Sequence, residues 1–133
     1  MKPILNLTQS GIRFPSNQLA VTTDALRNRR DALKRFLMGS IAGLAKLKSD
    51  RQFTMKVLEK YLRIGEPALL SEAYDFWVGV YAPKFRAEPE EVETYLALNA
   101  IKAKAQDFVD NSILSELDRE GFFEQINKKY GLR

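Results

Sequence analysis

A run of large apolar residues spaced three and four positions apart constrains the fold of this chain more than any other feature. The run begins after Asp31 and ends near Lys48, and this spacing places its members on one face of an α-helix. The residues on that face are Leu33, Phe36, Leu37, Ile41, Leu44 and Leu47. Met38, Ala42 and Ala45 widen the apolar surface, so we expect this helix to pack against more than one neighbour.

Cap and stop signals divide the remainder of the chain into shorter helices. Thr22 or Thr23 can cap a small helix, and Asp50 can cap one that ends before Gly65. Asp110 or Asn111 can cap a short helix that stops at Gly121. The remaining expected helices run from Pro67 towards Pro83, from Pro89 to the lysines Lys102 and Lys104, and over one or two turns between Phe122 and Tyr130.

Residues 17–22 have a different character and predict a short strand. Leu19 and Val21 alternate with Ala20 and Thr22, which is the period of a β-strand. Before them, residues 1–16 show no sustained period and read as an irregular leader. We therefore expect one domain over residues 1–133, mainly α with one or two short strands and about five to six helices, the helical region covering 23–133.

The absence of two residue types limits the chemistry of the chain. Its 133 residues include no cysteine and no histidine, the commonest metal ligands and the commonest general base. The seven glycines stand singly, without the spacing of a phosphate-binding loop. The carboxylates Glu90, Glu91 and Glu93 are typical of a helix N-terminus. We expect no catalysis, no metal and no cofactor.

Charge is distributed unevenly along the chain. Residues 1–65 hold 13 Lys and Arg against 4 Asp and Glu, whereas residues 66–133 hold 8 against 13, so the halves carry +9 and −5 within a total of +4. This polarity suits either a basic binding face or attraction between the halves within one fold, and we favour the second. The basic cluster from Arg27 to Arg35 lacks an accompanying recognition pattern, so nucleic acid is not an expected partner.

Aromatic residues between Tyr74 and Tyr81 suit either a ligand pocket or a packing stripe. Tyr74, Trp77 and Tyr81 share one helical face, which favours packing in the core. Phe76 points away from that face and would meet a second surface.

Several segments, taken in order, resemble the C-terminal part of nitrate/sulfonate/taurine-type ABC-transporter substrate-binding proteins. The resemblance starts at Gly11 and extends almost to the end of the chain, through short motifs that are individually weak in specificity. They are RDALKRFL (30–37), LEKYL (58–62), EPALLSEAYDFW (66–77), PEEVETYL (89–96) and DFVDNSILSELDREGF (107–122).

The resemblance implies a part of a two-lobed, type II periplasmic binding protein that delivers a small organic or anionic solute to a membrane permease. It implies that residues 17–22 are a crossover strand of a sheet formed elsewhere and that Ser16 and Asn17 border the ligand cleft. The first lobe and most of the second would precede this chain, together with an export signal that the chain itself does not contain. The full-length parent would be periplasmic or extracytoplasmic.

A piece of such a protein would expose an apolar surface, so we expect self-association, as a homodimer or with strand exchange. The alternatives are a standalone helical protein-interaction module and, less favoured, a basic nucleic-acid-binding domain.

Overall fold

The computed structural model describes residues 18–80 and 86–132, and within these ranges the chain is helical and contains no strand. The expectation of a mainly α fold is confirmed at this level. The elements are α1 (Thr23–Asn28), α2 (Arg30–Ser49), α3 (Arg51–Leu62), α4 (Pro67–Val80), α5 (Pro89–Leu98), the 3₁₀ helix η2 (Ala105–Phe108), α6 (Ser112–Arg119) and α7 (Phe122–Tyr130).

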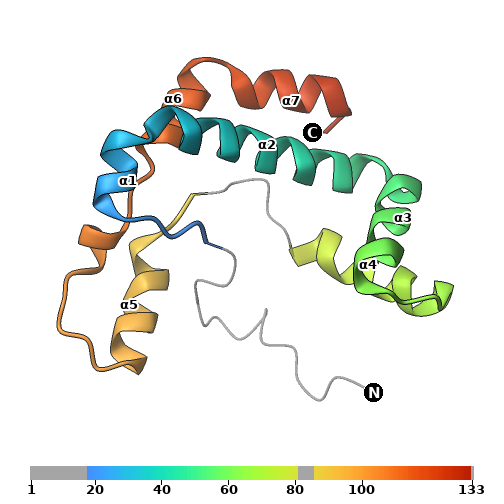
Figure 1. Ribbon diagram of the computed structural model, residues 1–133, viewed down its shortest axis with the longest axis horizontal. Helices are drawn as coiled ribbons and strands as arrows, with labels where there is room; N and C mark the ends of the chain where they lie inside the picture. Colours follow the sequence, from blue (N-terminus) through green and yellow to red (C-terminus); the bar gives the residue numbers. More distant parts are fainter. Residues whose placement is uncertain (1–17, 81–85, 133) are drawn as a thin grey trace.

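The helices form an open arch whose span is α2 (Figure 1). Helices α6 and α7 lie along the outer side of α2, and α1 and α5 lie at one end of it. Helices α3 and α4 descend from the other end. Helix α2 contacts α1, α3, α6 and α7, which confirms the expectation that it has several neighbours. None of the helices in these ranges combines the length and the apolar character that a membrane span requires.

The main core lies between α2, α6 and α7. Its buried members are Ile41 and Ala45 of α2, Ile113, Leu114 and Leu117 of α6, and Ile126 of α7. Leu117 has no exposed surface. Phe36, which the sequence places on the buried face, is 58% exposed, so that expectation is wrong. At 100° per residue Phe36 lies about 140° around the helix from Ile41, too far to reach α6 and α7.

The expected strand does not form in the described part of residues 17–22. Gln18 to Thr22 precede α1 without a strand partner, and Leu19 and Val21 are each more than two-fifths exposed. Thr22 is extended, with φ −73° and ψ 154°, and its hydroxyl accepts a hydrogen bond from the Ala25 amide as the N-cap of α1. A strand needs a neighbour to pair with its backbone, and the described residues supply none. Residues 1–16, the expected leader, and Asn17 lie outside the described ranges.

Helices α3 and α4 both donate a hydrogen bond to one carbonyl near the end of α2. The hydroxyls of Thr54 and Tyr74 both donate to the Leu47 carbonyl, at 3.2 and 3.4 Å. Carbonyls in the last turn of a helix have no partner within that helix, so these donors satisfy an otherwise open acceptor.

Asp50 caps α3 as expected, by accepting a hydrogen bond from the Phe53 amide. Tyr74 is buried as expected, but Trp77 on the same face remains 39% exposed. Tyr81 and the expected end of α4 near Pro83 lie outside the described ranges.

Helix α5 ends at Leu98, several residues before the expected end at Lys104. Ala100 adopts a left-handed conformation with φ 53°. Its amide donates to the Ala97 carbonyl, and the Ile101 amide donates to the Leu96 carbonyl. This pair of bonds is a Schellman motif, which terminates a helix. The expectation failed because the residue in the left-handed position is alanine, where glycine is the usual signal.

Helices α6 and α7 follow the expected cap and stop signals. The Ser112 amide donates to the Asp110 carboxylate at 2.8 Å at the start of α6. Gly121, with φ 72°, forms the turn between the two helices, in a conformation that favours glycine. The turn folds α7 back along α2 and buries Ile126 in the core.

Candidate functional site

The sequence-predicted ligand residues Ser16 and Asn17 lie outside the described ranges. Gln18, which follows them, is exposed, and its amide donates to the Glu91 carboxylate in the first turn of α5 at 2.9 Å. Glu90 and Glu91 occupy that first turn, as expected for carboxylates at a helix N-terminus.

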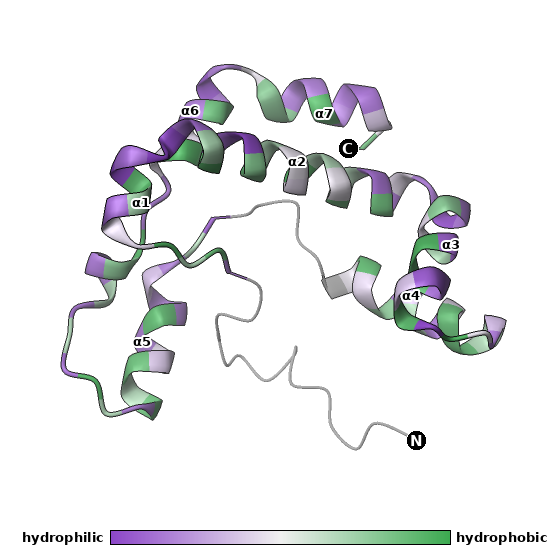
Figure 2. Ribbon diagram, in the orientation of Figure 1, coloured by the Kyte–Doolittle hydropathy of each residue, from purple (hydrophilic) through white to green (hydrophobic). Residues whose placement is uncertain are grey.

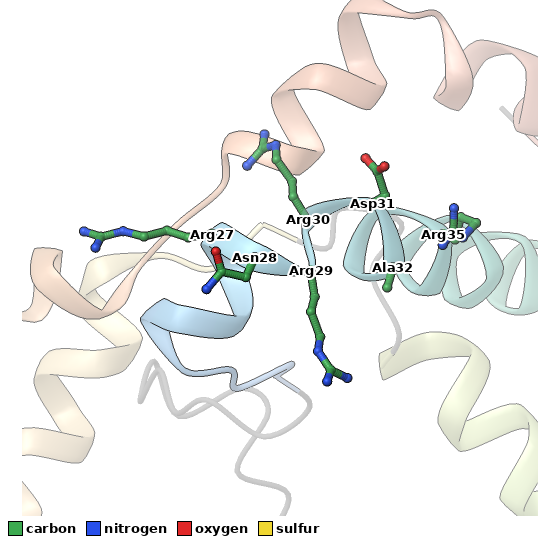
Figure 3. A pocket seen from close by; sticks show the side chains of 7 residues that line it. All are labelled: Arg27, Asn28, Arg29, Arg30, Asp31, Ala32 and Arg35. Carbon is green, nitrogen blue, oxygen red and sulfur yellow. The ribbon is translucent and has the colours of Figure 1, made fainter.

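A hollow of about 420 Å³ lies at the junction of α1 and α2. Its lining is strongly basic and consists of Arg27, Asn28, Arg29, Arg30, Asp31, Ala32 and Arg35. The arginine side chains point in different directions and do not converge on a common point (Figure 3). A site that recognises one phosphate or carboxylate needs donors aimed at one place. The hollow therefore has the charge of an anion site without its geometry.

Arg30, which lines this hollow, belongs to a network of ion pairs between α2 and α6. Its guanidinium contacts Glu116 at 2.9 Å and donates to the Ser112 hydroxyl at 3.0 Å. Lys34, one turn later on α2, contacts Glu116 at 2.6 Å and Glu120 at 2.7 Å. The basic N-terminal half and the acidic C-terminal half thus attract each other within the fold, which confirms the favoured reading of the charge pattern.

The network shifts the pKa values of Lys34 and Glu116. Hydrogen bonds to Glu116 and then to Glu120 raise the pKa of Lys34 above its ordinary value. Hydrogen bonds from Lys34 and then from Arg30 hold the pKa of Glu116 below its ordinary value. Both shifts favour the charged forms, which strengthens the attraction between α2 and α6.

Of the basic residues that line the hollow, Arg27, Arg29 and Arg35 take no part in the ion pairs with α6. All three are exposed, and none forms an ion pair with another residue in the described ranges. The junction of α1 and α2 is accordingly among the most hydrophilic parts of the ribbon (Figure 2).

Asn111 makes a contact that the sequence did not indicate. Its side-chain amide donates to the Ala87 carbonyl at 2.9 Å, and its side-chain oxygen accepts from the Ala87 amide at 3.1 Å. This two-way bond pairs the start of α6 with the segment that leads into α5. A cap position followed by a serine signals only a helix start, so no local pattern distinguishes this long-range use of Asn111.

Large apolar side chains are exposed at many places on the described residues. Thirteen large hydrophobic residues are exposed, against ten hydrophobic residues in the core. The exposed set comprises Leu19, Val21, Phe36, Phe53, Tyr61, Leu62, Leu69, Phe76, Trp77, Tyr95, Leu98, Ile101 and Phe108. Single exposed hydrophobics are ordinary, but this many on an open arch indicate surfaces suited to contact with other protein.

A second hollow of about 660 Å³ opens on α3 and is lined by Arg51, Gln52, Met55 and Lys56. Arg51 already has partners, because its guanidinium donates to the Ser71 hydroxyl and lies 5.0 Å from the centre of the Tyr74 ring.

Within residues 18–80 and 86–132, no three Asp or Glu side chains lie close enough together to hold a metal ion.

Comparison with protein-family models, with curated proteins and with solved structures found no match for this chain.

Proposed function

We propose that this chain is the C-terminal helical portion of the solute-binding component of an ABC-type importer. The solute is a small organic or anionic molecule, and the portion is not catalytic. In the full-length parent, Ser16 and Asn17 border the ligand cleft, a membrane permease receives the solute, and the site of action is periplasmic or extracytoplasmic.

The contact between α2 and α6 carries this proposal. The segments RDALKRFL and DNSILSELDREGF belong to the ordered set of motifs that resembles the family, and they are about 80 residues apart in the sequence. Arg30 and Lys34 of the first bind Ser112, Glu116 and Glu120 of the second. Motifs that belong to one ancestral unit are expected to pack together, and this contact supports that origin.

The open form of the arch also supports a part within a larger body. Helices α4 and α5 stand at opposite ends of α2 (Figure 1), and both carry exposed large apolar residues, such as Trp77 and Leu98. A sheet and further helices contributed by a preceding lobe would cover such surfaces.

The coding sequence immediately upstream of Met1 tests the proposal. We expect an in-frame region that encodes the first lobe and an export signal, with permease genes nearby. The extended protein is then purified and screened by thermal denaturation against small anions, sulfonates and heterocycles. A solute present at 100 times its Kd would stabilise the extended protein by about 2.7 kcal/mol. The 133-residue chain, which lacks most of the cleft, serves as the control and should not respond.

A helical protein-interaction module is the second candidate, and the number of exposed apolar side chains favours it. It predicts no upstream lobe and a protein partner that remains bound through purification at high salt. An extended protein that binds no solute, or an upstream region without such a lobe, would transfer support to this candidate.

A further inference from the structure

The basic hollow at the junction of α1 and α2 continues along α2 to an exposed aromatic ring. Ala32, which lines the hollow, lies about 160° around the helix from Arg30, so it faces away from the ion pairs with α6. Arg29 extends to the same side as Ala32, whereas Arg30 and Asp31 extend to the opposite side (Figure 3). Phe36 follows Ala32 by one turn and therefore shares its face. Phe36 is 58% exposed.

Three arginines around this face have no carboxylate partner among the described residues. Arg29 lies at the junction, where its amide donates to the Ala25 carbonyl and its carbonyl accepts from the Leu33 amide. These bonds satisfy its backbone and leave its guanidinium exposed to solvent. Arg27 lies at the α1 end of the hollow and Arg35 at the α2 end (Figure 3).

The surface beside Phe36 is open. Gly39 follows Phe36 by one turn, and a Cβ added at Gly39 would meet no side chain and no other segment within 4 Å. A flat group can therefore approach the ring without displacing a neighbour. The sequence indicated no aromatic residue beside the basic cluster, because the helical spacing placed Phe36 in the core. Its exposure puts an aromatic ring next to the arginines.

The directions of the arginine side chains decide which kind of anion suits this surface. One small anion needs donors aimed at one point, and these side chains diverge (Figure 3). The flat surface of an anionic membrane needs cations that face one plane, which the same divergence prevents. A flexible chain of phosphates can bend from one guanidinium to the next, and an unpaired base on that chain can stack on an exposed ring. The charges and the ring together favour a single strand of nucleic acid.

We propose that the junction of α1 and α2 binds single-stranded nucleic acid without sequence preference. Arg27, Arg29 and Arg35 each contact a phosphate, and Phe36 provides the face on which one base stacks. Arg30 takes no part, because Glu116 and Ser112 hold its guanidinium on the other side of α2. The proposal concerns the 133-residue chain and does not rest on the transport function proposed above.

Fluorescence anisotropy of the full chain with a labelled oligothymidylate of about 12 nucleotides tests the binding. Three phosphate contacts predict that the logarithm of the binding constant falls with the logarithm of the salt concentration with a slope of about −2. We expect a Kd on the order of 10 µM at about 20 mM salt. A Kd above about 1 mM at this salt, or a slope near zero, would overturn the proposal. The transport proposal would stand, because it is tested with solutes on the extended protein.

Arg29→Gln tests whether the junction is responsible. The loss of one phosphate contact should weaken binding about tenfold at about 20 mM salt and reduce the salt slope by about 0.7. The melting temperature should not change, because the Arg29 side chain has no ion pair with a described residue. Lys128→Gln is the matched control, since it removes the same charge from an exposed position on α7. It should weaken binding no more than about twofold, and equal weakening in both variants would overturn the assignment to the junction.

Phe36→Leu separates a nucleic acid from other chains of phosphates. Leucine is apolar and a good helix former, so the fold should be retained while the stacking face is lost. Binding of the oligothymidylate should weaken about fivefold, whereas binding of inorganic polyphosphate, which has charge but no bases, should not change. An equal effect on the two ligands would overturn the stacking role of Phe36. Displacement of the labelled strand by vesicles that contain an anionic lipid would overturn the choice of nucleic acid over a membrane.

Discussion

Glu116 is the residue through which the two oppositely charged halves of the chain meet. Its carboxylate contacts Arg30 and Lys34 of α2, and Lys34 and then Arg30 hold the pKa of Glu116 below its ordinary value of 4.5. Because the folded pKa is lower than the unfolded one, the stabilisation is fully present above about pH 4.5. It is lost as the pH falls through the folded pKa.

Glu116→Gln should therefore lower the stability of the fold at pH 7 and reduce its loss between pH 5 and pH 3, about the range in which a depressed carboxyl pKa acts. Urea unfolding followed by circular dichroism at pH 7, 5 and 3 measures both effects. Glu124→Gln on α7 is the control, because Glu124 is exposed and forms no ion pair with the described residues. If the Glu116 variant loses as much stability on acidification as the native chain, the ion-pair network does not govern the acid response.

Helix caps and tight turns were predictable from the sequence, because each depends on residues only a few positions apart. Thr22 and Asp50 accept from amides three residues ahead, and Gly121 supplies a left-handed turn, as the sequence indicated. Charge asymmetry predicted attraction between the halves, but it did not identify Glu116 as the meeting point. The two-way bond of Asn111 with Ala87 depends on a fold that brings distant segments together, so no local pattern marks it.

At the scale of elements, the helices were predicted better than their ends and their faces. The period of α2 was correct, yet Phe36 was assigned to the buried face because positions three and four apart spread over a wide arc. The strand over 17–22 was predicted from alternation alone, and alternation does not provide the neighbour that a strand requires. The predicted ligand residues Ser16 and Asn17 remain predictions.

The C-terminal turn of α5 provides a test of element termination. Ala100 has φ 53°, a conformation that costs a residue with a Cβ roughly 1 kcal/mol and glycine almost nothing. Ala100→Gly should therefore stabilise the fold by roughly 0.5 kcal/mol, after the greater freedom of glycine in the unfolded chain is subtracted. Ala97→Gly, within the same helix, is the matched control and should destabilise by about 1 kcal/mol. Urea denaturation measures both, and destabilisation of equal size at the two positions would contradict the left-handed assignment.

At the scale of the whole molecule, the arch divides into parts with few shared contacts. The core joins α2, α6 and α7, whereas α4 packs mainly on α3, and α5 packs mainly on η2. Helix α3 connects the α3–α4 pair to α2, with the Leu47 carbonyl as a shared hydrogen-bond acceptor. In such a structure the free energy of local opening should differ between parts, because each part depends on its own buried residues.

Native-state hydrogen exchange on two core variants tests this division. Leu117, which is fully buried, lies in the core of α2, α6 and α7, and Leu117→Ala should reduce protection there by about 2–5 kcal/mol. Leu70, which is 4% exposed on α4, lies outside that core, so Leu70→Ala should reduce protection in α3 and α4 and spare α6 and α7. The α3–α4 pair can open while α2 stays folded, so protection in α6 should be almost the same in the Leu70 variant as in the native chain. Uniform loss of protection in both variants would instead show that the arch unfolds as one cooperative unit, with the contacts of α3 and of Tyr74 on α2 sufficient to couple its ends.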